Sequence, residues 1–349
     1  MKQGGIEGVY PLLARLEKYV HKLPGRLDDV LGKWNAAKDR IFVRLTGQAS
    51  HNRIETALQN KLGDPDIAFR QKLRFEPDLA CAVAQAELIL LAAPTQYVRG
   101  TLEKLRAVPR PAGIIYLNVA KGIETGSCKR ISELVAEVLG DVRYAILSGP
   151  SHAEEVARRV PTAVMTASRD AQAATTVQQA FMNEYLRVYT STDVVGAELG
   201  GSLKNVLALA AGILDGMGMG DNTKAALMTR GIVEMARLGE ALGGRPETFS
   251  GLSGIGDLIV TCTSKHSRNR HVGEELGKGR KLAEIQKEMG MVVAEGVTTA
   301  SGAYQLARRA GATTPIIDEV YASLYADKDP RLAVRELMLR DPKPEIHRS

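Results

Sequence analysis

The feature that most limits the fold of this chain is a change in the spacing of its apolar residues near residue 192. From Phe75 to that point, short apolar runs of strand length alternate with segments of helical periodicity. Beyond it, apolar residues recur only with helical spacing. Alternating strands and helices are typical of an α/β domain with a parallel sheet, and an unbroken series of helical segments is typical of an all-helical domain. The sequence therefore predicts one domain of each kind, in that order.

The segment ELILLAAP at 87–94 illustrates the strand pattern, because a near-continuous apolar run stopped by proline is expected of a strand buried on both faces. Predicted strands lie at 87–94, 113–123, 144–151, 162–168 and 186–193. The helices predicted before and between these strands lie at 77–86, 95–108, 131–140, 152–159 and 171–183. Helices predicted after the last strand lie at 195–214, 223–243, 247–252, 267–277, 281–289, 296–310 and 315–326.

Composition limits the class of protein. A length of 349 residues suffices for two domains of ~150 residues each, and 44% hydrophobic with 25% charged residues is ordinary for a soluble globular enzyme. No apolar run reaches the ~18 residues that a membrane span needs, and the first residues lack the apolar core of a signal peptide. We therefore expect neither a membrane span nor secretion.

The cysteines and the net charge indicate the cellular compartment and the kinds of molecule that the protein could bind. Cys81, Cys128 and Cys262 are odd in number and widely spaced, which disfavours a disulfide framework and fits a reducing cytoplasm. The formal net charge of +6 comes from basic residues scattered among acidic ones, with only 5% aromatic residues. This pattern favours a solvated basic surface first, attraction of small phosphorylated molecules second, and nucleic-acid binding last.

Lys204 lies within the apolar helical pattern ELGGSLKNVLALAAGIL at 198–214. Lysine is rarely buried unless it is paired, and Gly200 and Gly201 one turn earlier suggest that something approaches the helix backbone closely. A desolvated lysine would have a lowered pKa and could transfer protons. Periodicity alone does not distinguish a buried, proton-transferring lysine from a lysine whose amine reaches the surface. The glycine-rich stretch at 212–222 that follows is interpreted as a functional loop.

A second cluster lies in TCTSKHSRNRHVGEEL at 261–276. Ser267 is a natural N-cap, which puts Arg268, Asn269 and Arg270 into the first turn of a helix. Cations there oppose the helix dipole, but they suit a site where an anion such as phosphate binds the helix N-terminus. An ordinary capped surface helix is the alternative. His266 and His271 have no third ligand nearby, so no metal site is predicted.

Three further candidates lie at the ends of predicted strands or in a glycine-rich turn. Gly149 and Ser151 follow a strand in SGPSHAEEVARR, and Lys121 follows another in NVAKGIETG. Open α/β sheets bind ligands at the carboxyl ends of their strands, although plain turns use the same residue types. Asp257 follows the turn GLSGIG, where an acid would either cap a helix or contact a substrate hydroxyl.

Taken together, these segments closely resemble the bacterial NAD(P)-dependent glycerol-3-phosphate dehydrogenases. The resemblance rests on LSGPSHAEEVARRVPTAV, VVGAELGGSLKNVLALAAGILDGMGMGDNTKAALMTRG, GRPETFSGLSGIGDLIVTCTSKHSRNR and VVAEGVTTA, and it runs from about Phe75 to Asp341. It implies a Rossmann-like, doubly wound parallel sheet at 1–194, a helical substrate-binding domain at 195–342 and a short tail at 343–349.

The resemblance also implies a reaction: hydride transfer from NADH or NADPH reduces dihydroxyacetone phosphate to sn-glycerol 3-phosphate for phospholipid synthesis. Lys204 matches the lysine that binds substrate and transfers its proton, and Lys121 matches the lysine that contacts cofactor and substrate. The other matched substrate contacts are Gly149, Ser151, Asp257, Ser267, Arg268 and Asn269. The matched cofactor contacts, besides Lys121, are Ala153, Arg268, Val293 and Glu295.

Residues 1–72 depart from the family pattern, because no strand there leads into the G-x-G-x-x-G loop that cradles the pyrophosphate. An artefact of the gene sequence would explain this abrupt break, and we favour it over a rebuilt cofactor site. A related 2-hydroxy acid or ketopantoate reductase is a second interpretation, disfavoured by the phosphate-type segment SRNR. A third is a relative that binds a phosphorylated ligand without turnover. Preference between NAD and NADP stays open, as does pairing of the helical domain in a homodimer.

Overall fold

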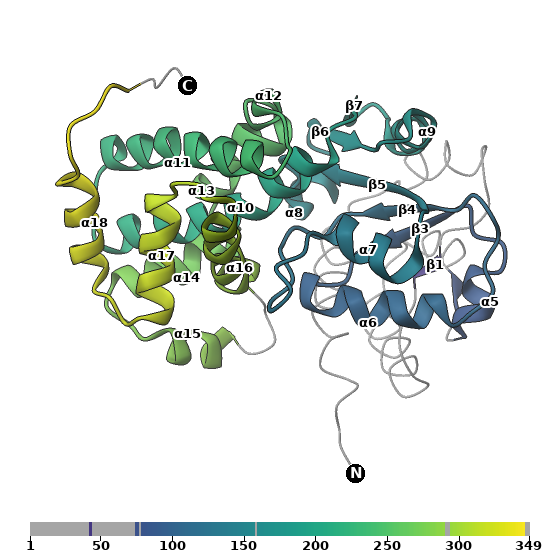
Figure 1. Cartoon of the computed structure of the whole chain (residues 1–349), viewed down its shortest axis with the longest axis horizontal. Helices are drawn as coiled ribbons and strands as arrows, with labels where there is room; N and C mark the ends of the chain where they lie inside the picture. The colour runs from purple at the N-terminus through teal and green to yellow at the C-terminus, as the bar shows by residue number, and fades with distance from the viewer. Residues whose placement is uncertain (1–41, 44–73, 77, 158, 290–293, 346–349) are drawn as a thin grey trace, which may run out of the picture.

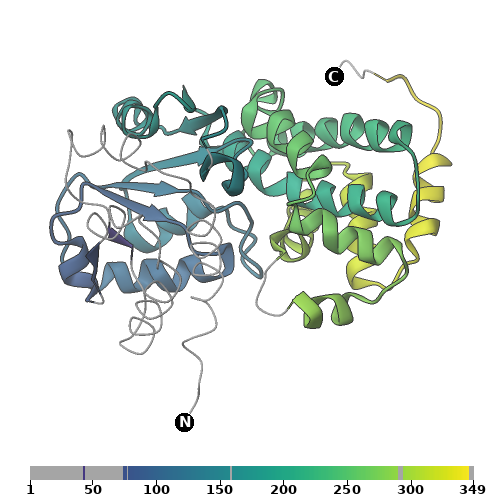
Figure 2. The same cartoon turned by 180° about the vertical axis from the view of Figure 1, so that it is seen from behind.

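The computed structural model describes residues 42–43, 74–76, 78–157, 159–289 and 294–345. Within these ranges, a sheet half and a helical half lie side by side, as Figures 1 and 2 show from opposite sides. The chain passes from one to the other between Ser191, the last residue of strand β7, and Val194, the first residue of helix α10. After that point the described residues form helices and no strand.

The main sheet has five strands in the order β3-β4-β5-β6-β7. Every residue of β4 is buried, which explains why its sequence is apolar almost without interruption. The five strands are Leu88–Leu91 (β3), Ile115–Asn118 (β4), Arg143–Ser148 (β5), Thr162–Ala167 (β6) and Leu186–Ser191 (β7). A short parallel pair, Phe42–Val43 (β1) and Arg74–Phe75 (β2), precedes them. The accompanying helices are Leu79–Val83 (α5), Thr95–Arg106 (α6), Ile131–Leu139 (α7), Ala153–Ala157 (α8) and Ala171–Phe181 (α9).

The sheet is Rossmann-like but not parallel throughout, which corrects the prediction of a wholly parallel sheet. Strands β3, β4 and β5 are parallel, as are β6 and β7, but β5 and β6 run antiparallel, with Ile146 opposite Ala167. The connecting helix α8 has five residues and so rises only about 8 Å, whereas a six-residue strand spans about 20 Å. Because α8 is too short to carry the chain back along β5, β6 starts at the end where β5 stops.

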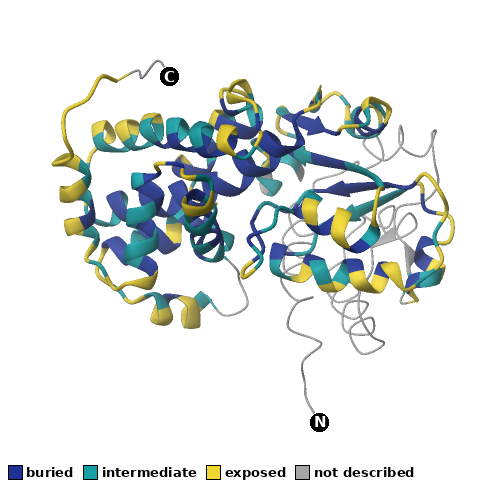
Figure 3. Cartoon of the chain, viewed as in Figure 1, coloured by how far each residue is buried: buried dark blue, intermediate teal, exposed yellow. Residues whose placement is uncertain are grey.

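Helix α10 (Val194–Gly216) forms the centre of the helical half, and Figure 3 shows it buried along most of its length. It is the one described helix long and apolar enough to cross a membrane, but its whole apolar window is enclosed by the protein. Around it lie Asp221–Ala241 (α11), Pro246–Phe249 (α12), Leu252–Gly256 (η1, a π-helical turn), Asp257–Thr263 (α13), Arg268–Gly277 (α14), Leu282–Met289 (α15), Glu295–Ala310 (α16), Pro315–Tyr325 (α17) and Pro330–Met338 (α18).

The glycine-rich stretch at 212–222 is only partly a loop, which corrects its interpretation as one. Gly212 and Gly216 belong to α10 and face Gly273 and Gly277 of α14. A methyl group on Gly212 would overlap the carbonyl oxygen of Arg270, and one on Gly273 would overlap that of Leu209. These four glycines therefore let the two helix backbones touch.

Contacts of the first turns of α10 join the two halves. The buried carboxylate of Glu198 accepts hydrogen bonds from Arg130 and Ser132 at the start of α7 and from the Tyr144 hydroxyl of β5. A neighbouring apolar cluster contains Ile146 of the sheet together with Val194 of α10. The core of the sheet half is thus completed by residues of the helical half.

A buried lysine pair at the junction of sheet and helices

Lys204 is buried in the middle of α10, with 7% of its surface exposed. Its ammonium group donates to Asp257 Oδ1 at 2.5 Å and to Thr261 Oγ1 at 2.7 Å. Asp257 and Thr261 are four residues apart on α13 and so lie on one face of that helix. An ammonium group has three N–H donors, and within the described residues the third has no acceptor. Lys204 is therefore a paired, buried lysine with one donor to spare, and not one that reaches the surface.

Lys121 reaches the same carboxylate from the sheet half. It follows strand β4, and its ammonium group donates to Asp257 Oδ2 at 2.6 Å and to the Gly149 carbonyl oxygen at 2.8 Å. Gly149 has φ +132°, and a side chain there would press on the backbone of Val164 at 3.1 Å, so this turn requires glycine. Asp257 thus holds a lysine from each half of the molecule, and Gly256 before it is the N-cap of α13, so Asp257 is not the helix cap that the pattern suggested as one of its two roles.

The electrostatics of this cluster follow from one buried carboxylate that pairs with two lysines, of which Lys204 is buried and Lys121 is half-buried. Burial lowers the pKa of Lys204 to about 8, although the charge of Asp257 opposes that shift. Burial alone would raise the pKa of Asp257, but Lys121 and Lys204 outweigh it and hold that pKa below its ordinary value. Two ammonium groups and one carboxylate leave a net positive charge, which attracts a polarised oxygen or an anion.

The glycines before Lys204 make room for what surrounds it. A methyl group on Gly200 would lie 2.5 Å from the carbonyl oxygen of Ser253 in η1. On Gly201 it would lie 2.9 Å from the Ser148 hydroxyl and 3.4 Å from the side chain of Lys121. The close approach that the two glycines indicated is therefore present, and it brings β5, η1 and Lys121 against α10.

The start of α14 lies beside this cluster. Ser267 caps the helix, as predicted, by accepting from the Arg270 N–H at 3.2 Å. Asn269 donates to Asn205 Oδ1 at 3.0 Å and accepts from the Gly296 N–H at 2.9 Å, so it links α10, α14 and α16. Arg268, half-buried, occupies the first helical position. The turn thus presents a capped helix N-terminus next to Lys204.

Arg270 does not join this N-terminal group, contrary to its inclusion with the anion-binding residues of the first turn. Its guanidinium donates to Asp215 Oδ2 of α10 at 2.6 Å, and Asp215 also pairs with Lys224 of α11. The pairing neutralises the cation whose position in the first turn looked unfavourable. Arg270 therefore fastens α14 to α10.

Among the described residues matched to cofactor contacts, Lys121 and Ala153 lie in the sheet half, whereas Arg268 and Glu295 begin helices of the helical half. Ala153 is half-buried at the first position of α8, and Ser151 just before it donates to the Gly149 carbonyl at 2.9 Å. Glu295 begins α16 and accepts from the Thr95 N–H, at 3.4 Å, at the start of α6. Val293 and the region of the expected glycine loop lie outside the described residues.

The sequence interpretation did not single out two side chains of this site. Thr261 receives a hydrogen bond from Lys204, and Asn205 donates to the Lys121 carbonyl at 3.0 Å while accepting from Asn269. The spacing of Thr261 four residues after Asp257 was an available signal. The position of Asn205 beside Lys204 was another, but its partners come from distant segments.

Two family models match the chain. The N-terminal model of the NAD-dependent glycerol-3-phosphate dehydrogenases matches residues 30–174, and the C-terminal model of the same family matches residues 193–335. The chain belongs to this family. The N-terminal match begins well before Phe75, where the resemblance in the sequence starts.

Individual relatives agree with the family models. Glycerol-3-phosphate dehydrogenase [NAD(P)+] of Lysinibacillus sphaericus is 51% identical over 298 residues, covering 84% of this chain and 87% of that protein. The enzyme of the same name from Geobacillus kaustophilus is 47% identical, covering 90% and 94%. The crystal structure of glycerol-3-phosphate dehydrogenase from Coxiella burnetii superposes with a TM-score of 0.79 at 36% identity, covering 90% of this chain and 95% of that one.

Proposed function

We propose that this chain reduces dihydroxyacetone phosphate to sn-glycerol 3-phosphate with NADH or NADPH. Membership of the family and relatives at about half identity over most of the chain support an NAD(P)-dependent dehydrogenase of this kind. Nothing in these comparisons favours a relative that binds its ligand without turnover.

The observation that best supports the proposal is the buried ammonium group of Lys204, which has one N–H without an acceptor within the described residues. Reduction of a ketone adds a hydride to the carbonyl carbon and a proton to the carbonyl oxygen. Lys204 supplies that proton, while Asp257 and Thr261 fix the direction in which its remaining N–H points. In the reverse direction, neutral Lys204 accepts the proton of the alcohol. The net positive charge of the cluster also stabilises the developing oxyanion.

The phosphate group has a suitable site one helix away. The N-terminus of α14, with Arg268 in its first turn and Ser267 as its cap, provides N–H groups and a guanidinium for an anion. Asn269 holds this turn at a fixed distance from Lys204 through Asn205. We assign the phosphate to this turn, so that the carbonyl of the same small molecule can reach Lys204.

The sheet side has a chemistry that fits a dinucleotide. Thr95 starts α6 beyond the carboxyl end of β3, where open α/β sheets bind nucleotides, and its buried hydroxyl has no partner within the described residues. Thr95, Lys121 and Glu295 would hold the nicotinamide end there, next to Lys204. When bound, the dinucleotide supplies the hydride.

The setting of the reaction belongs to the same proposal. The product is a building block for phospholipid synthesis, and Cys81, Cys128 and Cys262 are free thiols, which supports a reducing, cytoplasmic location. We keep a homodimer as the proposed assembly. No nucleic-acid partner or structural metal is part of the proposal.

The first test is oxidation of NADH and of NADPH by the purified protein with dihydroxyacetone phosphate. General acid–base groups contribute about 10²- to 10⁴-fold to a rate, so Lys204→Ala should lower kcat by that factor. Lys281, an exposed lysine paired with Asp327, provides the control Lys281→Ala, which should keep the wild-type rate.

Melting curves of both variants show whether each one folds. A folded Lys204→Ala protein with wild-type kcat would refute the assignment of Lys204. Wild-type protein that oxidises neither cofactor, yet melts at a higher temperature with glycerol 3-phosphate, would refute the dehydrogenase activity while retaining the substrate site.

A further inference from the structure

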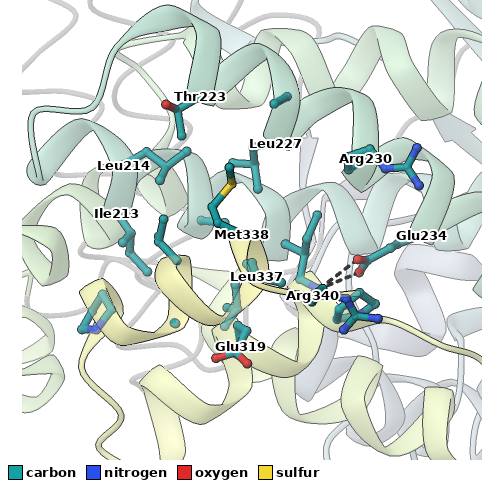
Figure 4. Close-up of a pocket in the computed structure, with 18 of the residues that line it drawn as sticks. Ile213, Leu214, Thr223, Leu227, Arg230, Glu234, Glu319, Leu337, Met338 and Arg340 are labelled. Carbon is teal, nitrogen blue, oxygen red and sulfur yellow. Dashed lines mark hydrogen bonds between the residues drawn. The ribbon is translucent and has the colours of Figure 1, made fainter. Parts of the chain in front are cut away.

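A second site lies on the far side of the helical half. A cavity of about 330 Å³ that is partly open to solvent is lined by α10, α11, α17 and α18 (Figure 4). Its volume is at the low end of the size range of small-molecule sites. It begins on α10 at Ala210, six residues after Lys204 and so about 9 Å further along the helix. No residue of the cluster around Asp257 lines it.

Most of the cavity wall is apolar. Ile213 and Leu214 of α10, Leu227 of α11 and Leu337 and Met338 of α18 point toward its centre in Figure 4. Met338 is 78% exposed and so remains largely in water although it borders an apolar space. Exposed apolar side chains around a cavity are typical of a surface that binds an apolar group.

One end of the cavity is charged. Arg230, Glu234 and Arg340 lie together at the end opposite Ile213 and Leu214 (Figure 4). Both carboxylate oxygens of Glu234 accept a hydrogen bond from the Ile316 N–H, and Oε2 also accepts one from the Ile317 N–H.

The remaining charges at the cavity are mostly basic. Glu319 is paired with Lys328, and Arg237 donates to the Thr313 carbonyl close to Glu234. In the described part of the chain, Arg230, Arg340 and Lys343 have no ion pair with an acidic side chain, and Glu234 and Asp341 are the acidic residues of the wall left to oppose them. The charged end therefore has an excess of positive charge.

From this arrangement we propose that the cavity binds an amphipathic anion with a single alkyl chain, such as a medium-chain carboxylate. The chain occupies the apolar space, and the anionic head is held by Arg230 and Arg340. Burial of the chain supplies most of the affinity, and the guanidinium groups of Arg230 and Arg340 select the sign of the head group. This site is independent of the dehydrogenase reaction proposed above.

Calorimetric titration of the full-length protein with decanoate, below the concentration at which it forms micelles, tests the proposal. Wild-type protein should bind one decanoate per chain, and decyltrimethylammonium, with the same chain and the opposite charge, should not bind. Removing both cations in Arg230→Gln/Arg340→Gln should weaken decanoate binding tenfold or more. The matched control, Arg331→Gln/Arg335→Gln, removes two charges of α18 that do not line the cavity and should leave binding unchanged.

A second pair of variants tests the cavity itself. Ala226 and Ala225 are exposed neighbours on α11, but only Ala226 lines the cavity, so Ala226→Trp should abolish binding and Ala225→Trp should not. Equal binding of the ammonium compound, unchanged affinity without the two arginines, or no binding by folded wild-type protein would each overturn the proposal. So would displacement of decanoate by NADH with glycerol 3-phosphate, which would place it at the dehydrogenase site.

Discussion

At the scale of single residues, the ammonium group of Lys204 is subject to two opposing effects. Burial disfavours its charge and lowers its pKa to about 8, while Asp257 and Thr261 keep it hydrogen-bonded in one orientation. A group that titrates close to neutral pH can both give and accept a proton, as a reversible dehydrogenase requires. The same lysine at the surface would stay protonated and could act in only one direction.

The two directions of the reaction should therefore respond to pH in opposite ways. Reduction needs Lys204 protonated, so its kcat/KM should fall as pH rises through about 8, and oxidation of glycerol 3-phosphate needs Lys204 neutral, so its kcat/KM should rise over the same range. Measurement of kcat/KM, which reports the pKa values of the free enzyme, in both directions between about pH 7 and about pH 9 checks this. Parallel profiles in the two directions would contradict it.

How far the site could be predicted depends on which contacts are local in sequence. The Ser267 cap is set by neighbours in the chain and was predicted correctly, as was the close approach at Gly200. The two lysine partners of Asp257 could not be predicted, because they lie 136 and 53 residues away along the chain. A pattern of residue types carries no information on which distant side chains share one carboxylate.

At the scale of elements, the glycines between α10 and α14 set the distance between Lys204 and the helix N-terminus assigned to phosphate. Gly273 faces the Leu209 carbonyl with no room for a methyl group. Any side chain there separates the helices and moves Ser267 and Arg268 away from α10. Packing and catalysis therefore depend on the same contact.

Gly273→Ala should lower the free energy of unfolding by about 1–3 kcal/mol, the usual cost of overpacking, and should raise the KM for dihydroxyacetone phosphate. Gly100→Ala is the matched control, because Gly100 lies in helix α6 with nothing within 4 Å of the added methyl group. There the same change should stabilise the protein by about 0.5–1 kcal/mol. Urea unfolding and steady-state kinetics on both variants give the comparison, and a neutral Gly273→Ala would refute the close contact.

The elements themselves were largely predictable, since strands and helices of ordinary length have clear periodicity. The direction of β6 was not, because direction depends on whether α8 can cross the sheet, and its five residues cannot. The π-helical turn η1 and helix α13 were not predicted, because the glycines at 251–256 indicated a simple turn. Helix α18 was not predicted either, and it is one of the helices that line the cavity beside Arg230 and Arg340.

At the scale of the whole molecule, one buried carboxylate should shape the dependence of stability on pH. Burial raises the pKa of Glu234 to about 7, although two backbone N–H groups of α17 and the charge of Arg237 oppose the shift. A carboxyl whose pKa is raised by folding stabilises the fold below its unfolded value, and that stabilisation is lost as pH rises through the folded value. The exposed Glu137 and the half-buried Glu275, with pKa values of about 2, act in the opposite sense and only at lower pH.

The free energy of unfolding should therefore fall, by up to about 3 kcal/mol, as pH rises from about 4.5 to about 7. In Glu234→Gln this slope should flatten, whereas Glu240→Gln, at an exposed position of the same helix, should keep it. Urea unfolding at a series of pH values measures the slope. An identical slope in wild type and Glu234→Gln would show that another group causes it.

The contacts across the junction of the two halves bear on how the chain folds while it is being synthesised. Domains generally fold as units during translation, with the N-terminal domain first. Here the sheet half is not complete at Ser191, because Ile146 is covered by Val194 and the Tyr144 hydroxyl binds Glu198. The first turns of α10 must leave the ribosome before that core can close. The two halves differ in sequence pattern, but during synthesis the sheet half cannot finish folding until the first turns of the helical half have been made.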